Sequence, residues 1–186
     1  MSDESSAGQP PGTAGGATPT PAMIEAAAGA KAALDPEGRE PALAAMAWRP
    51  VRAAGFNAHV GPVDFAPTHT ASYGLLALDD RHINAGGVCH GGVLLTMADI
   101  TMGKTTFDLG DQHPCSTIQM DCHFVAAAKI GQVLLCRAHQ VRKAGGLSFM
   151  ACEMAAGARI VARASGVWKY LASRAPGQAR PGEGLL

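Results

Sequence analysis

The amino-acid sequence predicts an α+β fold in which an antiparallel sheet wraps around one long central helix. The first observation is a helical run of about four turns, residues 93–107, which is apolar nearly all round and must be buried on most sides. The second is a series of strand-like segments that follow it, at 115–125, 131–141, 147–156 and 159–171. The third is that the joints between these segments are short, and short joints connect antiparallel neighbours because parallel strands need a long crossover.

Composition divides the chain into three parts. Residues 1–50 form an N-terminal extension that we expect to be disordered or weakly helical, because residues 1–22 carry too little apolar bulk to offset the entropy of ordering. The Ala-rich residues 22–34 predict a weak helix within this extension. We expect one folded domain over residues 51–173 and a flexible C-terminal tail over residues 174–186, where Pro, Gly, Arg and Ala return.

Within the domain, residues 71–79 predict a strand, and the Gly-rich residues 84–92 predict a loop that leads into the long helix. The segment at 115–125 alternates as a strand with two unlike faces does. One predicted face carries Ile118, Met120, Cys122 and Phe124, and the other carries Thr117, Gln119, Asp121 and His123. The last segment alternates in the same way, which supports a sheet with one side toward the helix.

Bulk composition excludes several classes of function. The 186 residues carry a formal net charge of +0 and no basic run, so nucleic acid is not an expected partner. No apolar run approaches the roughly 18 residues that cross a bilayer, and the N-terminus lacks the features of a secretory signal. The five cysteines form no CxxC pair and no zinc-binding spacing, so we expect reduced thiols, a cytoplasmic protein and no metal.

One spaced motif carries most of the functional information. Asn84 is followed after five residues by His90, Gly91 and Gly92, and Asp99 comes nine residues after the histidine. This set resembles the signature of hotdog-fold acyl-CoA thioesterases, specifically the phenylacetate-pathway (PaaI-like) and human thioesterase-superfamily type. The resemblance covers about residues 70–172 and implies the hotdog fold, in which the central helix is the sausage.

The resemblance extends beyond the motif. Thr117 stands where the group has a Ser or Thr at the start of the next strand, and the turn at 142–149 and the strand that begins at Arg159 also look like the group. The resemblance to this group implies a thioester hydrolase that acts on acyl-CoA, and a homodimer that often pairs into a tetramer. One departure is Cys89, which stands where many relatives have an aliphatic residue.

Thioester hydrolysis requires a polarised carbonyl and a nucleophile, whereas the thiolate leaves readily because its pKa is near 8.5. We therefore expect no metal and no cofactor, with CoA entering only as part of the substrate. The N-terminus of the helix offers unpaired N–H groups and a positive dipole end. Gly91 and Gly92 have no Cβ to block a carbonyl oxygen, and we predict that the Gly91 N–H is the main donor.

Asp99 is the central predicted catalytic residue, since it is the only carboxylate in the predicted helix and a carboxylate in apolar surroundings is costly unless it is hydrogen-bonded or useful. It attacks the thioester directly or activates a water, and the sequence leaves both open. Gly91 lies eight residues, about 12 Å of helix axis, from Asp99. Both act on one carbonyl only across a dimer interface, with Gly91 and Asn84 from one chain and Asp99 and Thr117 from the other.

The remaining candidates have both functional and structural interpretations. We expect His90 to orient the loop by hydrogen bonding rather than to transfer a proton, and Asn84 either positions water or serves only as a turn residue. Thr117 binds Asp99 or the water, or is an ordinary strand threonine. The candidate CoA-binding residues are Gly92, Arg142, Lys143, Gly145 and Gly146, of which the two cations contact CoA phosphates or are simply solvated.

Three other functions compete with hydrolysis. A non-catalytic acyl-CoA-binding module has the same fold, and the intact Asp99 argues against it. A hotdog enoyl-CoA hydratase places a histidine five residues after its Asp, where this chain has Lys104. A purely structural interaction protein is the third. The acyl group, and the choice between CoA and a carrier protein, stay open.

Overall fold

The computed structural model describes residues 18–52 and 54–171. Of the disorder expected for residues 1–22, the part over residues 1–17 falls outside the described residues, as does the flexible tail expected at 174–186, whereas a helix already begins at Pro21. The domain boundaries at residues 51 and 173 therefore stay predictions.

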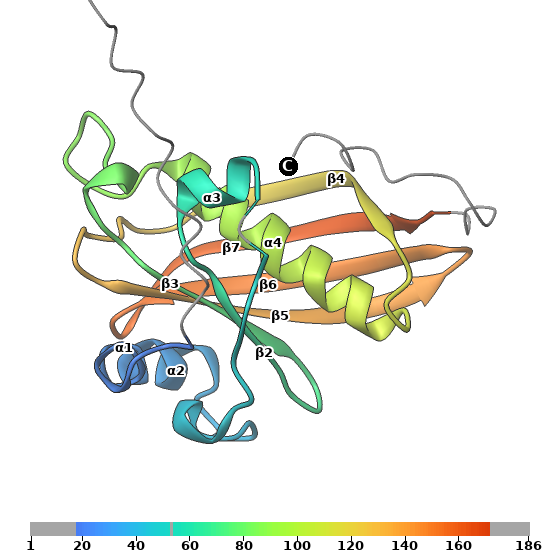
Figure 1. Ribbon diagram of the computed structural model, residues 1–186, viewed down its shortest axis with the longest axis horizontal. Helices are drawn as coiled ribbons and strands as arrows, with labels where there is room; N and C mark the ends of the chain where they lie inside the picture. Colours follow the sequence, from blue (N-terminus) through green and yellow to red (C-terminus); the bar gives the residue numbers. More distant parts are fainter. Residues whose placement is uncertain (1–17, 53, 172–186) are drawn as a thin grey trace, which may run out of the picture.

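A seven-stranded antiparallel sheet forms the body of the protein, with strand order β1-β2-β3-β5-β6-β7-β4 (Figure 1). The strands are β1 Arg49–Pro50, β2 Asp64–Pro67, β3 Ser72–Ala77, β4 Cys115–Phe124, β5 Val133–Ala144, β6 Leu147–Ala156 and β7 Arg159–Tyr170. All neighbouring strands pair antiparallel. The predicted α+β class is confirmed, and the short strands β1 and β2 are added to the predicted set.

The long helix α4, Gly91–Leu109, lies across one face of this sheet (Figure 1). Its sheet-facing side is fully buried and comprises Leu94, Met97, Ala98, Ile100, Thr101, Met102, Thr105 and Thr106. The helix is longer than predicted and includes a second carboxylate, so the expectation that Asp99 is its only acidic residue is wrong. Asp108, in the last turn, pairs with Lys104 and Arg49 and is thereby neutralised.

Strand β4 contains a β-bulge that changes which residues face the helix. The register with β7 shifts between Thr117 and Gln119, so Ile118 is the extra residue and is 56% exposed. Thr117 then shares the helix-facing side with Met120 and Cys122, which pack against the core. The predicted grouping of β4 is wrong at Ile118 and Thr117, because strict alternation of side chains cannot pass through a bulge.

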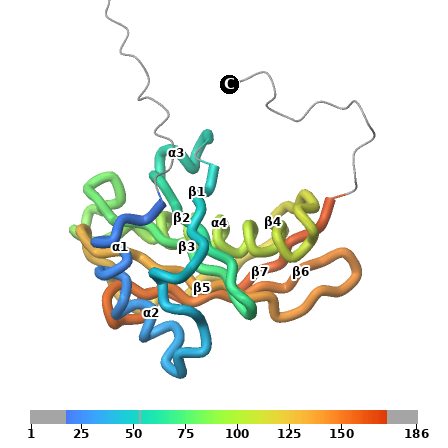
Figure 2. Tube along the Cα trace, turned by 60° about the horizontal axis from the view of Figure 1, so that its bottom comes forward, coloured from blue at the N-terminus to red at the C-terminus, as the bar shows by residue number. Residues whose placement is uncertain are grey.

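The N-terminal extension packs on the opposite face of the sheet. Helices α1 (Pro21–Ala26) and α2 (Ala28–Leu34) precede the 3₁₀ turn η1 (Leu43–Ala45), and α2 contacts β5, β6 and β7. Figure 2 shows α2 and α4 on opposite sides of these strands. A second buried cluster joins Ala27, Ala30 and Leu34 to Tyr73, Leu75 and Leu135 of the sheet. The extension thus covers the outer face around β3 and the adjoining ends of β5, β6 and β7, whereas Arg163, Ser165 and Lys169 of β7 stay exposed.

Two buried carboxylates order the extension, and one of them, Glu40, also joins it to the sheet. Asp35 accepts hydrogen bonds from the Lys31 ammonium at 2.5 Å and from the backbone N–H groups of Arg39 and Glu40 at 3.0 and 2.9 Å. Burial opposes ionisation of Asp35, but the Lys31 hydrogen bond and the two backbone N–H groups outweigh it and lower its pKa to about 2. Glu40 is buried as well, with Arg137 of β5 at 3.7 Å.

Two short elements close the N-terminal end of α4. They are helix α3, Phe56–Val60, and the 3₁₀ turn η2, Asp80–His82. Among the described residues, no helix has both the length and the apolar composition needed to span a membrane.

Candidate active site

The N-terminus of α4 leaves one backbone donor available. His90 is the N-cap, and its Nδ1 accepts the Gly92 N–H at 2.9 Å. The His90 N–H donates in turn to the His82 carbonyl at 2.7 Å. Within the described part of the chain, the Gly91 N–H has no acceptor, because it belongs to the unpaired first turn of the helix. It is therefore free to bind a carbonyl oxygen, whereas the Gly92 N–H is already used.

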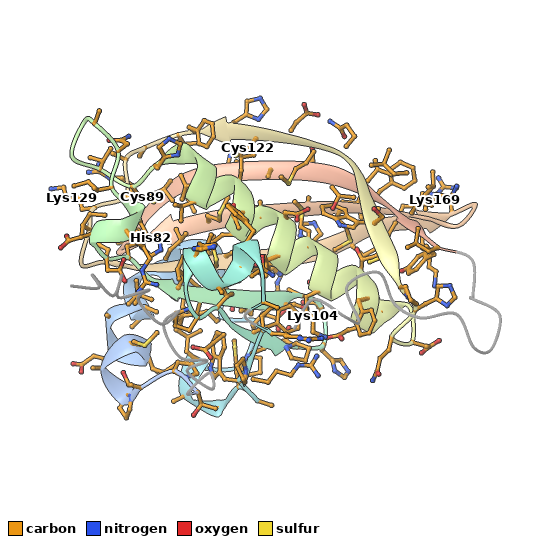
Figure 3. The ribbon with its side chains drawn as sticks, turned by 45° about the horizontal axis from the view of Figure 1, so that its top comes forward. His82, Cys89, Lys104, Cys122, Lys129 and Lys169 are labelled. Carbon is orange, nitrogen blue, oxygen red and sulfur yellow. The ribbon has the colours of Figure 1, made fainter. Side chains whose placement is uncertain are left out.

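A buried histidine that was not predicted fixes this loop. His82 is 1% exposed; its Nε2 lies 2.6 Å from the Val60 carbonyl, and its Nδ1 accepts the Asp79 N–H at 2.9 Å. Figure 3 shows it beside α3 and the N-terminal end of α4. Because the Val60 carbonyl only accepts, the proton of neutral His82 is on Nε2. The Asp79–His82 spacing of a capping box was the signal in the sequence that points to this role.

The ring of Phe124, at the end of β4, lies over Gly91. A Cβ built on Gly91 would be 3.2 Å from Cζ of this ring, so a side chain at Gly91 would crowd it. A Cβ on Gly92 would be 3.0 Å from Nδ1 of His90, so the capping histidine needs a glycine there. In one chain Phe124 is 56% exposed. It contacts the predicted oxyanion end of the helix.

Asn84 holds the loop that precedes α4. Its Oδ1 accepts the N–H groups of Gly86 at 2.8 Å and Val88 at 3.3 Å, which is the geometry of an Asx turn. Its side-chain amide nitrogen makes no hydrogen bond to another described residue, so it remains available. The turn role that the sequence left open is present, and a role in positioning water stays a prediction.

Asp99 lies on the exposed side of α4 and has one hydrogen-bond partner among the described residues. Thr117 donates its hydroxyl proton to Asp99 Oδ1 at 2.6 Å, which the bulge in β4 makes possible. Burial, together with the negative charge of Asp99, raises the pKa of the neighbouring Cys115 thiol. Asp99 is half-buried and most of its acceptor capacity is unused, since a carboxylate offers about four lone-pair sites.

The structure gathers the predicted residues into two groups rather than one. Asn84, His90 and Gly91 lie together at the start of α4, and Asp99 lies with Thr117 two turns further along the same helix. The two groups are separated by about 12 Å of helix axis. A single chain therefore does not bring both to one carbonyl.

The candidate CoA-binding residues other than Gly92 lie at the far end of α4. Gly145 and Gly146 form the β5–β6 turn with φ of 58° and 77°, which favour glycine. The Lys143 ammonium lies 4.7 Å from the centroid of the Tyr170 ring, and Arg142 is exposed beside it. In one chain these cations are at the opposite end from Gly91.

A cleft of about 380 Å³ opens at the N-terminal end of α4. Helix α3, the turn η2 and the first turns of α4 line it. Its walls include Phe56, Ile83, His90, Gly92 and Thr96. No sequence pattern predicted this cleft, because α3 approaches α4 only in the folded chain.

Comparisons with known proteins agree with this architecture. Residues 86–162 match the family described as the thioesterase superfamily. A curated relative from Pseudomonas aeruginosa, named "Putative esterase PA0474", is 32% identical over 94 residues, which is 50% of this chain and 70% of the relative.

Solved structures share the fold at low sequence identity. Zebrafish thioesterase superfamily member 2 is 22% identical with a TM-score of 0.57, covering 63% of this chain and 86% of that chain. A hypothetical thioesterase from Streptococcus pneumoniae, solved with coenzyme A, is 18% identical with a TM-score of 0.54, covering 69% and 91%. The Escherichia coli PaaI protein of the phenylacetic acid degradation operon is 16% identical with a TM-score of 0.54, covering 60% and 80%.

The structure contains a central helix, an antiparallel sheet and a capped glycine loop. The comparisons add a match to the family and a relative of which this chain covers 70%. The resemblance read from the motif is confirmed: this chain belongs to the thioesterase superfamily and has the hotdog fold.

Proposed function

We propose that this chain hydrolyses acyl-CoA thioesters to the free acid and CoA, with Asp99 as nucleophile or general base and the Gly91 N–H as oxyanion donor. The observation that carries the proposal is the pair of unsatisfied groups on α4, a free N–H at its start and a half-exposed carboxylate two turns later. Membership of the thioesterase superfamily gives this pair its chemical meaning.

The chemistry follows from the groups that are available. As a general base, Asp99 takes a proton from a water whose oxygen attacks the thioester carbon. As a nucleophile, it forms a mixed anhydride and expels the CoA thiolate, and water then cleaves the anhydride. In both cases negative charge develops on the carbonyl oxygen, where the Gly91 N–H and the positive end of α4 stabilise it. The thiolate then takes up a proton from solvent, and in the general-base route Asp99 releases its proton to solvent, so the carboxylate is restored. The reaction as proposed uses no cofactor.

A homodimer through β4 would complete the site. Strand β4 is an edge of the sheet, and its exposed apolar side chains include Ile118 and Phe124. Antiparallel pairing of two β4 strands about a two-fold axis between Met120 and Asp121 sets Thr117 opposite the partner's Phe124. Thr117 holds Asp99 and Phe124 covers Gly91, so this pairing moves Asp99 of one chain toward Gly91 of the other.

The same arrangement bears on CoA and on higher assembly. Arg142 and Lys143, at the opposite end from Gly91 in their own chain, would approach the partner's site and contact its CoA phosphates. The extension covers the outer face around β3 and the adjoining ends of β5 to β7, so any pairing of dimers into tetramers would use surfaces outside that region. We place the protein in the cytoplasm, where its five free cysteines stay reduced.

The test is release of free thiol from a panel of aryl- and alkyl-CoA thioesters, with the wild-type protein and the Asp99→Asn variant at matched dimer content. We expect hydrolysis by the wild type and its collapse in the variant. Hydrolysis that survives in Asp99→Asn would remove Asp99 from the mechanism.

A non-catalytic acyl-CoA-binding module is the second candidate, because the hydrogen bond from Thr117 gives Asp99 a structural partner. Tight binding of acyl-CoA by calorimetry without turnover of any thioester would favour this candidate over hydrolysis.

A further inference from the structure

We propose that the cleft between α3 and α4 binds the acyl group of the substrate, and that Phe56 determines which acyl groups fit. We name it the α3 cleft and define it by Phe56, Val60, Ile83, His90, Val93 and Thr96. The proposal rests on the proposed function, because it assigns the substrate class of the same site.

The α3 cleft is continuous with the proposed catalytic groups. It is lined by Gly92, next to the free Gly91 N–H, and by His90, the N-cap of the same helix. A thioester carbonyl held by the Gly91 N–H thus has the cleft directly beside its acyl side. A second cleft, lined by residues of the N-terminal extension such as Ile24 and Trp48, does not include α4.

The lining of the α3 cleft is mostly apolar and carries little net charge. Phe56, Val60, Ile83 and Val93 supply apolar surface. The one guanidinium on the wall, Arg81, is neutralised by Asp79, with its Nη2 2.7 Å from Oδ2 and its Nε 2.9 Å from Oδ1. An uncharged ligand therefore suits this wall better than a carboxylate or phosphate, since no free cation is there to bind an anion.

The imidazoles of the wall are largely committed to the fold. Both ring nitrogens of His82 are used, and Nδ1 of His90 caps α4. Only Nε2 of His90 and the exposed His59 are left to face a ligand. A volume of about 380 Å³ is at the small end for ligand pockets. The cleft thus fits a compact apolar acyl group, such as an aryl or short branched group, better than a long chain.

Phe56 is the residue of the cleft wall that would bury the most apolar surface against a ligand. It is 67% exposed, the highest value among the large apolar side chains of the described residues, and Ile83 on the same cleft is 48% exposed. Exposed apolar side chains that gather at one cleft mark a binding site. An acyl group between them would remove both from water.

The C-terminal end of helix α3 is anchored. Its last residue, Val60, is 6% exposed, and its carbonyl accepts a hydrogen bond from His82 Nε2. Its first residue, Phe56, follows Gly55, which has a φ of 57° that other residues rarely adopt. The C-terminal end of α3 is thus a fixed wall, and Phe56 at the other end sets the width of the cleft.

The test measures kcat/KM for wild type, Phe56→Ala and Phe56→Trp across CoA thioesters from acetyl through phenylacetyl and hexanoyl to dodecanoyl. Phe56→Ala should lose roughly 10-fold on the preferred compact acyl group and shift the optimum to longer chains, whereas Phe56→Trp should shift it to smaller groups. Leu109→Ala, which truncates another exposed apolar residue at the far end of α4, should leave the profile unchanged.

Binding of non-hydrolysable acyl-CoA thioethers separates this proposal from the proposed function. If the wild type binds them with an acyl preference that Phe56→Ala alters but hydrolyses no thioester, the cleft assignment stands and hydrolysis fails. If the protein hydrolyses thioesters with one acyl profile in all the Phe56 variants, the cleft assignment is overturned. An unchanged profile with a shifted dimer content in Phe56→Ala would overturn it too, because Phe56 would then serve contact with a second copy.

Discussion

Carboxylates on the two sides of the sheet differ in how many of their acceptor sites are filled. On the outer face, the side chain of Asp35 is 5% exposed and accepts hydrogen bonds from one ammonium and two backbone N–H groups. On the helix side, Asp99 is half-buried and accepts one hydrogen bond, from Thr117. A carboxylate whose acceptor sites are filled holds structure together, whereas one with empty acceptor sites retains capacity for a water or a substrate.

The difference between these carboxylates predicts opposite results of mutation. Removing a buried carboxylate whose acceptor sites are all filled leaves its hydrogen-bond donors without an acceptor. This lowers the free energy of unfolding, because the lost hydrogen bonds no longer offset the desolvation of those donors. Removing a carboxylate with empty acceptor sites leaves few donors without an acceptor, so we expect it to lower activity rather than stability. The following experiments test that division, from the largest expected effect to the smallest.

Asp99→Asn should have the largest effect. We expect kcat/KM for acyl-CoA hydrolysis to fall by about 10³-fold, since the amide can neither attack nor accept a proton. The melting temperature should stay close to that of the wild type, because Asn still accepts the hydrogen bond from Thr117. A melting temperature that fell while activity persisted would assign Asp99 to structure.

Asp35→Ala should show the reverse pattern. We expect a loss of about 2 kcal/mol in the free energy of unfolding at pH 7, since three hydrogen bonds to a charged group disappear, and little change in kcat/KM. Urea unfolding followed by circular dichroism measures the loss. Glu37→Ala is the matched control, because Glu37 is exposed and nearby, and an equal loss in both variants would contradict the prediction.

Asp64 makes stability depend on pH. It is 2% exposed, its Oδ1 has no partner among the described residues, and burial raises its pKa to about 6. The folded state therefore binds this proton more tightly than the unfolded state, whose value is 3.8. The resulting stabilisation is fully present below pH 3.8 and is lost as the pH rises through about 6.

Comparison of Asp64→Asn with the wild type isolates this effect from the other titrating groups. We expect the variant to gain up to about 2 kcal/mol over the wild type between pH 4 and pH 7.5, measured by urea unfolding at both values. A difference between the two proteins that stayed constant over this range would show that Asp64 does not titrate there.

Thr117→Val should have the smallest effect. Replacing the hydroxyl by a methyl group of similar size removes the hydrogen bond to Asp99, and we expect kcat to fall by about 10-fold with KM little changed. Thr117→Ser keeps the hydroxyl and should retain most of the activity. Equal activity in the Val and Ser variants would show that this hydrogen bond does not support the reaction.

The sequence predicted those parts of the fold whose pattern is continuous along the chain. The helix α4 was expected because about four turns are apolar nearly all round, and the strands β4 to β7 were expected from alternating segments with short joints between them. The bulge at Ile118 was missed because one extra residue leaves no mark in composition. The packing of the extension was missed because its contacts use small residues; a Cβ on Gly29 would lie 3.3 Å from the Ala158 backbone.

The candidate site was predictable in part for the same reason. Spaced residues on one helix and its loop identified Gly91 and Asp99 as the candidate donor and carboxylate. His82, Phe124 and the α3 cleft depend on how distant segments meet in space, which local pattern does not encode. The pairing of Asp99 with Thr117 required the bulge, so strict alternation placed Thr117 on the wrong side.

The position of the extension also has a consequence for biosynthesis. Helix α2 ends at Leu34, and Tyr73 and Leu75 of β3 join its buried cluster, but most of its contacts are with strands that begin with β5 at Val133, so the ribosome completes its docking surface only after about 100 further residues. At roughly 5–20 residues per second, α2 waits about 5–20 seconds with its inner side incompletely covered. Alanine and glycine dominate that helix, and such a weakly apolar side gives the nascent chain little tendency to associate wrongly before its own sheet exists.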